Sequence, residues 1–532
     1  MKFQYFLLIL SVFAIFSCAR RGRPEGGPKD FEKPIMVKAD PDFKSLYFEE
    51  DEIKIYFDEY VKLKDVNSQL IISPPLKNSP VITPLGSPSK KITIKLSDTL
   101  QENTTYTFNF AQSIIDNTEG NILDNFKYIF STGEYIDSLK VKGEIQDAFD
   151  LEMIENPTIM LYPVNEAYTD SIIFNEKPTY VGSTVDSLNW EITNIKAGTY
   201  RLIALNDARK NYIYNPKEDR VGFYPDLITI PGDSIFNMTL FKQILPFKLV
   251  SRPKDISKGH VIIGFEGDSK DVDIRMLSPV PDDFKSFYSK DRKTDTLNYW
   301  FNHFELDSMM LEIRKDQLID TVKIGMKEDE IDSLRLELSS YGMLHLRDTL
   351  KLGSTVPMMK VDTSKFYFID KDSLKVPLRL AISERKDRID FHFDKETNQS
   401  YKLFIEPGAI EDILGVQNDT IKASLKTGKV SDYCSIFMTI SNVKSFPAII
   451  ELINDKGEIV AKKFATEPRE YEFKNLKPSR FMIRIIYDDN GNQKWDTGNF
   501  LQNIQPEGVY YVKTIIDAKA NWEVEETIML KP

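Results

Sequence analysis

The feature that most constrains the fold of this chain is an internal duplication. Asn103–Gly133, NTTYTFNFAQSIIDNTEGNILDNFKYIFSTG, aligns without a gap with Asn398–Gly428, NQSYKLFIEPGAIEDILGVQNDTIKASLKTG. The matched positions are Tyr106 with Tyr401, Ile115 with Ile410, Asp116 with Glu411, Gly120 with Gly415, Asp124 with Asp419, and Thr132-Gly133 with Thr427-Gly428. Because a strand–loop–strand unit that recurs within one chain is typical of a duplicated module, the sequence predicts two copies of one domain.

A second stretch is duplicated in the same order. Ile195–Asp207, IKAGTYRLIALND, aligns without a gap with Leu476–Asp488, LKPSRFMIRIIYD, and each lies downstream of one copy of the first repeat. The chain has 532 residues, too many for a single hydrophobic core. We therefore expect a domain of the first type, one of the second type, a spacer, and then the two types again.

Apolar residues in the first part of the chain alternate with polar ones. Such alternation is typical of half-buried antiparallel strands, and proline and glycine punctuate the gaps between the runs. The sequence therefore predicts an all-β chain of sandwich domains. In the spacer, Leu306–Ile319 fits either an amphipathic helix or a bent hairpin, and a further β-sandwich is expected there. The alternating residues are Ile53, Ile55 and Phe57; Ile92, Ile94 and Leu96; Tyr106, Phe108 and Phe110; and Phe126, Tyr128 and Phe130.

The N-terminus is organised like an export signal. Residues 1–17 place one positive residue, Lys2, before an apolar run that is too short to span a bilayer. Ile15-Phe16-Ser17-Cys18 resembles a bacterial lipobox, although Phe16 is bulkier than the commonest pattern has. The resemblance implies that Cys18 becomes the mature N-terminus and carries lipid, whereas the alternative is an ordinary secretory signal with a chance cysteine. Residues 18–34, rich in Gly, Pro and charge, are expected to form a flexible tether.

Residues 35–133 contain four motifs: FDEYV (Phe57–Val61), IISPPL (Ile71–Leu76), LQENTTYTFNF (Leu100–Phe110) and FSTG (Phe130–Gly133). Together they resemble the bacterial Ig-like domain first named from S-layer proteins, which recurs at the N-terminus of Bacteroidetes-type lipoproteins. The resemblance implies an Ig-like β-sandwich without catalytic residues. Residues 346–428 are expected to be a second, diverged copy, because the FDEYV and SPPL motifs are not seen there.

The second repeat, a Gly-x-Tyr strand followed by Asn206-Asp207, resembles prealbumin-like and SD-repeat-type domains of surface proteins. The resemblance implies small sandwiches in which a strand runs into an acidic loop. Residues 134–247 and 429–532 are expected to be two such domains, separated from each other by a β-rich spacer at residues 248–345 and the second Ig-like copy.

The composition excludes several functional classes. Lys+Arg number 69 and Asp+Glu 81, which gives a net charge of -12 without any basic run, so nucleic acid is not an expected partner. Two cysteines, Cys18 and Cys434, are too few for a disulfide framework or a four-cysteine metal site. The sequence has no HExxH, GxSxG or GxxxxGK[ST] motif. The adjacent acids Asp58 and Glu59 would point to opposite faces of a strand, which argues against a shared catalytic site.

One loop has the spacing of a calcium site. In Asp488–Gly498, DDNGNQKWDTG, side-chain oxygens fall at Asp488, Asn490, Asn492 and Asp496, and the backbone carbonyl of Lys494 is available. Calcium takes six to eight oxygen ligands in flexible geometry, and SD-repeat-type loops resemble this one. Gln493 and Asn499 depart from the EF-hand pattern, and the equivalent loop of the first copy has Arg209 in place of Asn490. The alternative is a hairpin loop in which Asp and Asn serve turn geometry alone.

Taken together, these features predict a non-catalytic, lipid-anchored protein of the cell envelope, placed at the outer membrane, with a structural or binding role. Its expected partners are the membrane, through the lipid on Cys18, and a protein or glycan of the envelope. One alternative is an accessory subunit of an outer-membrane assembly or uptake complex. The other is a carboxylate-dependent hydrolase, which would need two carboxylates about 5–9 Å apart in a pocket.

Overall fold

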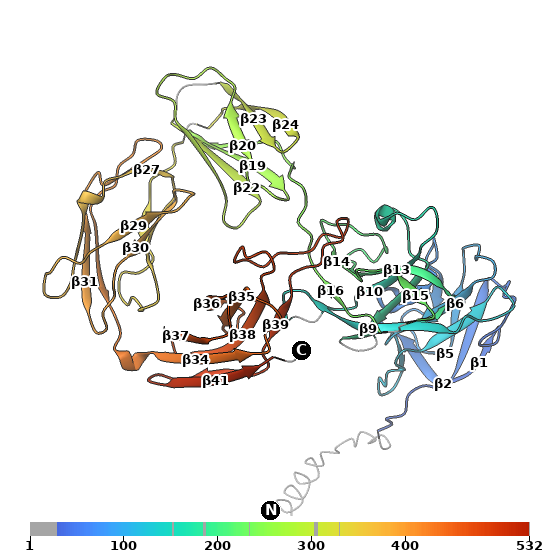
Figure 1. The fold of residues 1–532 in the computed structure, drawn as a ribbon. Coiled ribbons are helices and arrows are strands. Elements are labelled where there is room, and N and C mark those ends of the chain that lie inside the picture. The colour runs from blue at the N-terminus through green and yellow to red at the C-terminus, as the bar shows by residue number, and fades with distance from the viewer. Residues whose placement is uncertain are drawn as a thin grey trace, which may run out of the picture.

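A computed structural model describes residues 29–151, 154–184, 188–232, 235–302, 307–328 and 330–530. The predicted signal peptide and Cys18 lie outside these residues. The described chain is all-β, as predicted, and folds into tandem Ig-like β-sandwich modules, here numbered 1 to 5 (Figure 1). Each module has its own cluster of buried apolar side chains, which is what separate folding units require.

Module 1 is a sandwich of two antiparallel sheets over one core. One sheet has the order β1-β2-β5-β4 with β7 paired to β2, and the other has the order β3-β6-β8. The alternating residues of the sequence, such as Ile53, Ile55 and Phe108, fill the space between them. The elements are β1 (Met36–Asp40), β2 (Glu52–Leu63), α2 (Val66–Gln69), β3 (Ile71–Ser73), β4 (Val81–Thr83), β5 (Ser89–Lys95), β6 (Thr105–Asn109), β7 (Ile114–Asp116) and β8 (Lys127–Ser131).

Module 4 repeats this topology, with the long strand β2 replaced by two strands, β26 and β27. Its first strand, β25, pairs with β26, so the sheet begins before residue 346, where the sequence placed the domain boundary. The elements are β25 (Leu336–Leu338), β26 (Leu350–Ser354), β27 (Met358–Val361), η3 (Thr363–Lys365), β28 (Phe366–Ile369), β29 (Arg379–Ile382), β30 (Arg388–His392), β31 (Ser400–Ile405), β32 (Ile410–Asp412) and β33 (Ile421–Lys426).

The repeated residues make the same contacts in both modules. The Tyr106 hydroxyl accepts a hydrogen bond from the Gln101 backbone N–H at 2.9 Å, and Tyr401 does the same with Glu396 at 2.9 Å. The ungapped pairing of Asp116 with Glu411 is wrong, however. The buried carboxylate that accepts backbone N–H groups of the following turn is Asp116 in module 1 and Asp412 in module 4. Successive strand residues face opposite sides, so a shift of one position exchanges a buried side chain for a more exposed one.

Module 2 is one sheet that closes on itself. Its strands follow the order β14-β13-β10-β11-β12-β9-β16, with β15 paired to β13, and Val221 of β14 exchanges two backbone hydrogen bonds of 2.9 Å with Phe241 beyond β16. The elements are β9 (Leu139–Asp147), β10 (Thr158–Pro163), η2 (Asp170–Phe174), β11 (Tyr180–Thr184), β12 (Asn189–Ile195), β13 (Gly198–Asn206), β14 (Arg220–Phe223), β15 (Ile228–Ile230) and β16 (Met238–Leu240).

Module 5 has the same eight strands in the same order along the chain. Its first and last strands, β34 and β41, pair in parallel, as β9 and β16 do in module 2. Here, however, the strands form two separate sheets, β37-β34-β41 and β36-β35-β38-β39, with β40 paired to β38. The elements are η4 (Val430–Asp432), β34 (Cys434–Ser441), β35 (Ala448–Ile453), β36 (Ile459–Ala465), β37 (Glu470–Leu476), β38 (Ser479–Tyr487), β39 (Val509–Tyr511), β40 (Ile516–Ala518) and β41 (Glu523–Met529).

Module 3, the spacer, is a smaller sandwich, as expected. The ambiguous stretch Leu306–Ile319 is not a helix: its described part belongs to the hairpin of β23 and β24, in which Met309 and Leu311 face the core. The strands are β17 (Lys248–Leu249), β18 (Lys254–Ser257), β19 (His260–Glu266), β20 (Asp273–Met276), β21 (Ser286–Lys290), β22 (Thr296–Phe301), β23 (Ser308–Lys315) and β24 (Leu318–Gly325).

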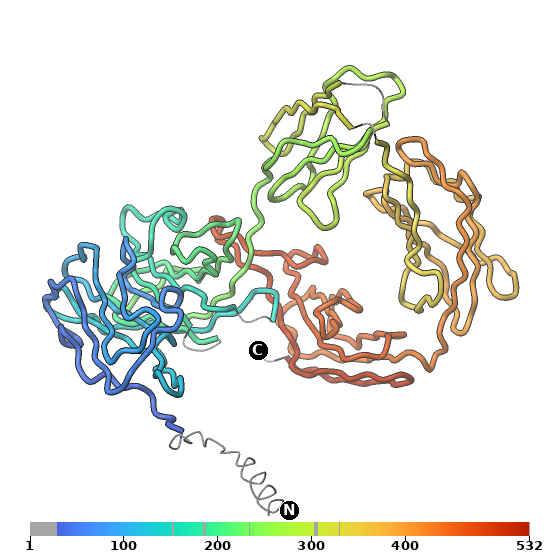
Figure 2. The backbone as a smooth tube through the Cα atoms, turned by 180° about the vertical axis from the view of Figure 1, so that it is seen from behind, coloured from blue at the N-terminus to red at the C-terminus, as the bar shows by residue number. Residues whose placement is uncertain are grey.

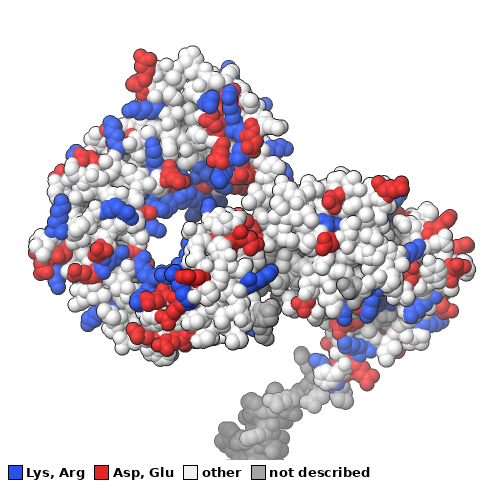
Figure 3. Space-filling view, viewed as in Figure 1, with Lys and Arg blue, Asp and Glu red and all other residues white. Residues whose placement is uncertain are grey.

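Modules 2 to 5 are arranged in a closed ring, and module 1 lies outside it beside module 2 (Figures 1 and 2). Modules 3 and 4 meet through Trp300, Val356 and Ile413, and modules 4 and 5 through a hydrogen bond of 3.0 Å from the Arg347 guanidinium to the Lys474 carbonyl. Module 5 then returns to module 2. The space-filling view shows the opening that the ring encloses (Figure 3).

Candidate functional site

The ring is closed by a long loop of module 5, Asp488–Glu507, which leaves β38 and returns to β39; we call it the closing loop. Phe500 of this loop is fully buried, and its ring packs edge-on against Phe223 of module 2 with the centroids 5.3 Å apart. The ring also covers the guanidinium of Arg201 in β13 at 5.4 Å, while Arg201 donates to the Asn503 side-chain oxygen at 3.1 Å. A buried apolar side chain and a buried guanidinium that donates to Asn503 therefore hold the closing loop on module 2.

Module 2 makes the reciprocal contact with module 5. Phe149, just beyond β9, lies 4.3 Å from the guanidinium of Arg484 in β38, and the Tyr511 hydroxyl donates to the Phe149 carbonyl at 2.7 Å. Arg484 is buried and paired with the buried Glu451, whose carboxylate lies 2.7 Å away. The strands β13 and β38 are equivalent in the two modules. Each thus presents an arginine on the face where the other module places a phenylalanine.

The first half of the closing loop contains the predicted calcium residues. The Asp488 carboxylate is fully buried and accepts from the backbone N–H groups of Asn492 at 3.0 Å and Gln493 at 2.8 Å. The side-chain amides of Asn490 and Asn492 both approach one oxygen of Asp496. The structure therefore brings Asp488, Asn490, Asn492 and Asp496 into one compact turn. In this geometry their oxygens are engaged with N–H groups of the loop itself.

The corresponding loop of module 2, Asp207–Asp219, is built in the same way. Asp207 accepts from the N–H of the fifth residue after it, Tyr212, as Asp488 does from Gln493, and both of those residues have a φ of 64°. A second acid closes each loop. Asp219 accepts from the backbone of Ala208 and Asn215 in module 2, and Glu507 accepts from Asp489 and Asp496 in module 5. The acidic residues thus set the loop geometry in both copies.

One carboxyl in each loop has a raised pKa. Burial raises the pKa of Asp207, and the neighbouring Asp219 adds to the shift. Burial likewise raises the pKa of Glu507, with Asp496 and Asp488 contributing repulsion. Removing a carboxylate from water disfavours its charged form, as do nearby like charges. The two loops therefore share a fold, but the carboxyl with the raised pKa is the first residue of the loop in module 2 and the last residue of the loop in module 5.

The calcium expectation for Asp488, Asn490, Asn492, Lys494 and Asp496 stays a prediction. Within the residues that the structure describes, no group of three or more His, Cys, Asp or Glu side chains is arranged to hold a metal ion. A calcium ion would therefore depend on amide and backbone oxygens as well as the two carboxylates, and the Asn amides would have to turn their oxygens inward. The lipidation residue Cys18 lies outside the described residues.

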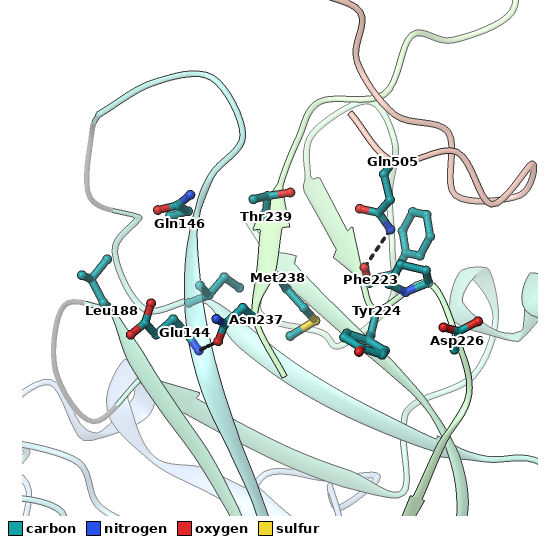
Figure 4. A pocket seen from close by; sticks show the side chains of 12 residues that line it. Glu144, Gln146, Leu188, Phe223, Tyr224, Asp226, Asn237, Met238, Thr239 and Gln505 are labelled. Atoms are coloured by element: carbon teal, nitrogen blue, oxygen red, sulfur yellow. Dashed lines mark hydrogen bonds between the residues drawn. The ribbon is translucent and has the colours of Figure 1, made fainter. Parts of the chain in front are cut away.

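A small pocket forms where the closing loop meets module 2 (Figure 4). It has a volume of about 400 Å³ and is lined by Glu144, Asp226 and Met238 of module 2 and by Gln505 of the closing loop. The Gln505 amide donates to the Phe223 carbonyl at 3.0 Å and so forms one wall. This wall comes from module 5, so the pocket in this form depends on ring closure.

The remaining residues that the sequence singled out make hydrogen bonds or pack within their own modules. Asp58 accepts from the Ile35 N–H at 2.8 Å, and the adjacent Glu59 faces the other way. Cys434 is buried in the core of module 5. His260, which the sequence did not single out, stacks on Trp300 with the ring centroids 3.6 Å apart and lies between the side chains of Asp332 and Asn298.

Sequence reasoning missed the residues that close the ring. Arg201 and Phe500 are far apart along the chain, and no motif links them. One signal was present: an isolated arginine lies within each duplicated apolar strand, Arg201 in TYRLIAL and Arg484 in FMIRIIY. A lone charge in a strand buried on both faces requires a partner from elsewhere in the molecule.

Comparisons with known proteins match one family model to the first module and find several solved structures of low similarity to the chain. Residues 30–132 match the family model of the bacterial Ig-like domain, as their motifs predicted. Solved structures similar to the chain include the S-layer protein rSbsC(31–844), with 11% identity over 91% of this chain and 67% of that one and a TM-score of 0.15. Another is BcpA, the major pilin subunit of Bacillus cereus, with 10% identity over 74% and 99% and a TM-score of 0.14. Titin domains A168–A170 match at 11% identity over 46% and 94%, with a TM-score of 0.14.

No curated protein sequence matches the chain. In the described part of the chain, no helix has both the length and the apolar character needed to cross a membrane.

Proposed function

We propose that the protein is a non-catalytic, lipid-anchored component of the bacterial cell envelope that holds a closed ring of β-sandwich modules at a membrane surface. The lipobox-like Ile15–Cys18 supplies the anchor, and residues 18–34 supply a tether long enough for the ring to stand clear of the lipid. Module 1, the bacterial Ig-like domain, follows the tether directly. The outer membrane is the proposed location.

The observation that carries this proposal is the closure of the ring. A string of sandwich modules joined only by linkers would move freely, because interfaces within a chain are usually small. Here side-chain contacts join module 3 to module 4, module 4 to module 5, and module 5 to module 2. The closing loop thus joins modules that are distant in sequence, with Phe500 fully buried. Such an arrangement favours a structural or binding role, in which fixed surfaces are presented together.

The anchor can be tested with the two cysteines of the chain. Cells that express the protein are labelled with a fatty-acid analogue and then fractionated. Cys18→Ala should abolish the label and release the protein from the membrane fraction, because the lipid supplies the membrane affinity. Cys434→Ala is the matched control and should keep both the label and the membrane fraction, since Cys434 is buried in module 5. Label that survives in Cys18→Ala would sink the proposal.

A further inference from the structure

A second, larger cleft lies between modules 1 and 2, away from the closing loop. It has a volume of about 1420 Å³. One wall is formed by α2, the turn between β3 and β4, and Gln112 of module 1. The other is formed by the ends of β10, β11 and β13 and the acidic loop of module 2. Small-molecule pockets are usually about 300–1,000 Å³, so this cleft has room for an extended ligand.

The width of the cleft is fixed by bonds between its walls. Lys177 of module 2 donates to the Leu76 carbonyl of module 1 at 2.8 Å, and Lys210 donates to the Ser68 carbonyl at 3.2 Å. A third bond joins the same two modules: the buried Val181 N–H donates to the Ser73 hydroxyl at 3.0 Å. A site held open in this way is preorganised, so a ligand does not have to order the two modules when it binds.

The polar side chains in the cleft are chiefly amides and hydroxyls. Among the described residues, the side chains of Asn67, Gln112 and Asn206 have no hydrogen-bond partner within the protein, although each can both donate and accept. The charged side chains of the lining nearly balance, since three are acidic and four are basic: Asp65, Glu155 and Asp207, and Lys77, Lys177, Lys210 and Arg220. Leucine and isoleucine, including Leu70 and Ile82, provide apolar surface between the polar groups.

We propose that this cleft binds a neutral oligosaccharide. Sugar hydroxyls donate and accept hydrogen bonds, as the amides of the lining do, and the C–H faces of sugar rings can cover the apolar patches. The balanced charge does not favour a polyanion, which would need clustered cations. The assignment deepens the proposed envelope function, on which it rests for the source of the glycan, by naming a ligand class and a site.

The test measures binding by the full chain in detergent. The probes are linear neutral oligosaccharides of increasing length from glucose and mannose series, with a uronic-acid oligomer and an unrelated extended peptide alongside, titrated by calorimetry. A neutral oligosaccharide should bind, and its affinity should rise with length until the cleft is filled. Asn67→Ala combined with Asn206→Ala removes one amide from each wall and should weaken binding about tenfold or more, from the loss of two hydrogen bonds.

Gln502→Ala is the matched control, because Gln502 is an exposed amide outside the cleft. It should leave the affinity unchanged, and an unchanged melting temperature of the double variant shows that the fold survives. Absence of binding by every neutral probe, equal binding by the double variant, or preference for the peptide or the uronate would overturn the assignment. The assay does not involve Cys18, so its failure is distinguishable from a failure of the membrane anchor.

Discussion

Modules 2 and 5 have the same eight strands in the same order, yet module 2 is a closed sheet and module 5 consists of two open ones. The two modules also differ in which of their strands contain glycine. A Cβ on Gly143 would lie 1.8 Å from the Phe236 carbonyl oxygen, one on Gly222 2.4 Å from that of Thr239, and one on Gly182 2.7 Å from that of Glu191. Gly222 lies where the edge strands β14 and β16 meet, whereas Gly143 and Gly182 lie between strands that are neighbours within the sheet. The strands β34, β36 and β39 of module 5 contain no glycine. The two modules thus share the strand order that the duplication gave them. Closure of the sheet in module 2 depends on positions where glycine lets two strand backbones come close together.

The two copies also differ in what their acidic loops do. In module 2 the chain reaches the next strand soon after Asp219, whereas in module 5 the equivalent loop is longer and carries Phe500, Asn503 and Gln505. These are the residues that contact module 2. The loop of module 5 therefore became the closing loop, and module 2 provides the surface to which it binds. The two copies of one duplicated module thus bind each other within the chain.

Removing the buried ring of Phe500 from the closing loop should have the largest effect. Phe500→Ala deletes a fully buried ring and should cost about 3–5 kcal/mol of docking free energy. The ring should then open, and small-angle scattering should show a larger radius of gyration. Trp522→Ala, an aromatic of module 5 that is 50% exposed, is the control and should leave the radius unchanged. An unchanged radius in Phe500→Ala would mean that other contacts close the ring.

Adding one methyl group to β9 of module 2, where the Phe236 backbone lies against Gly143, should have the next largest effect. Gly143→Ala places its Cβ on a backbone oxygen that cannot move without breaking the sheet, and should destabilise module 2 by about 3 kcal/mol. Hydrogen exchange of the β9 and β16 amides measures the change. Gly325→Ala in β24 is the control, because a Cβ there meets nothing within 4 Å. Equal protection in both variants would contradict the role given to glycine.

A smaller effect should appear in the pH dependence of the two loops. The raised pKa of Asp207 means that its contribution to stability is present below the ordinary value of 3.8 and is lost as the pH rises through the folded value. The Asp207→Asn variant has no carboxyl to ionise at this position. Its melting temperature relative to wild type should therefore increase as the pH rises from 3.8 through the folded-state pKa of Asp207. Glu507→Gln should behave in the same way above 4.5. A difference from wild type that stays constant with pH would contradict the shifts.

Calcium should have the smallest effect. Binding only to the folded loop at millimolar calcium should raise the stability of module 5 by about 1–2 kcal/mol. Melting the full chain with calcium and with a chelator tests this, using Asn490→Ala and Asp488→Ala. The control Asp207→Ala affects the first loop, where Arg209 occupies the place of Asn490. Equal melting temperatures with and without calcium would mean that Asp488 and Asp496 serve only to set the geometry of the turn.

Local patterns in the sequence predicted the strands and the all-β class well. The alternation at Ile53–Phe57 and Tyr106–Phe110 gave the strands of module 1, and the repeats gave the pairing of modules. Periodicity could not decide between helix and hairpin near Met309, because a short apolar run fits both. The match of Asp116 to Glu411 failed because a compensating insertion and deletion of one residue leave an ungapped alignment intact. Ring closure rests on contacts between residues hundreds of positions apart, such as Arg201 with Asn503.

The closed ring changes how a pulling force would pass through the molecule. If the N-terminus is held by lipid, as we propose, a load on module 3 or 4 would cross every intervening linker in series were the modules merely strung together. Closure provides a second route in parallel, from module 4 through module 5 and Phe500 to module 2. Each route then bears part of the tension. The docked closing loop would be the first contact to shear, because only side chains and hydrogen bonds join it to module 2, and its rupture would lengthen the tether while every sandwich stays folded.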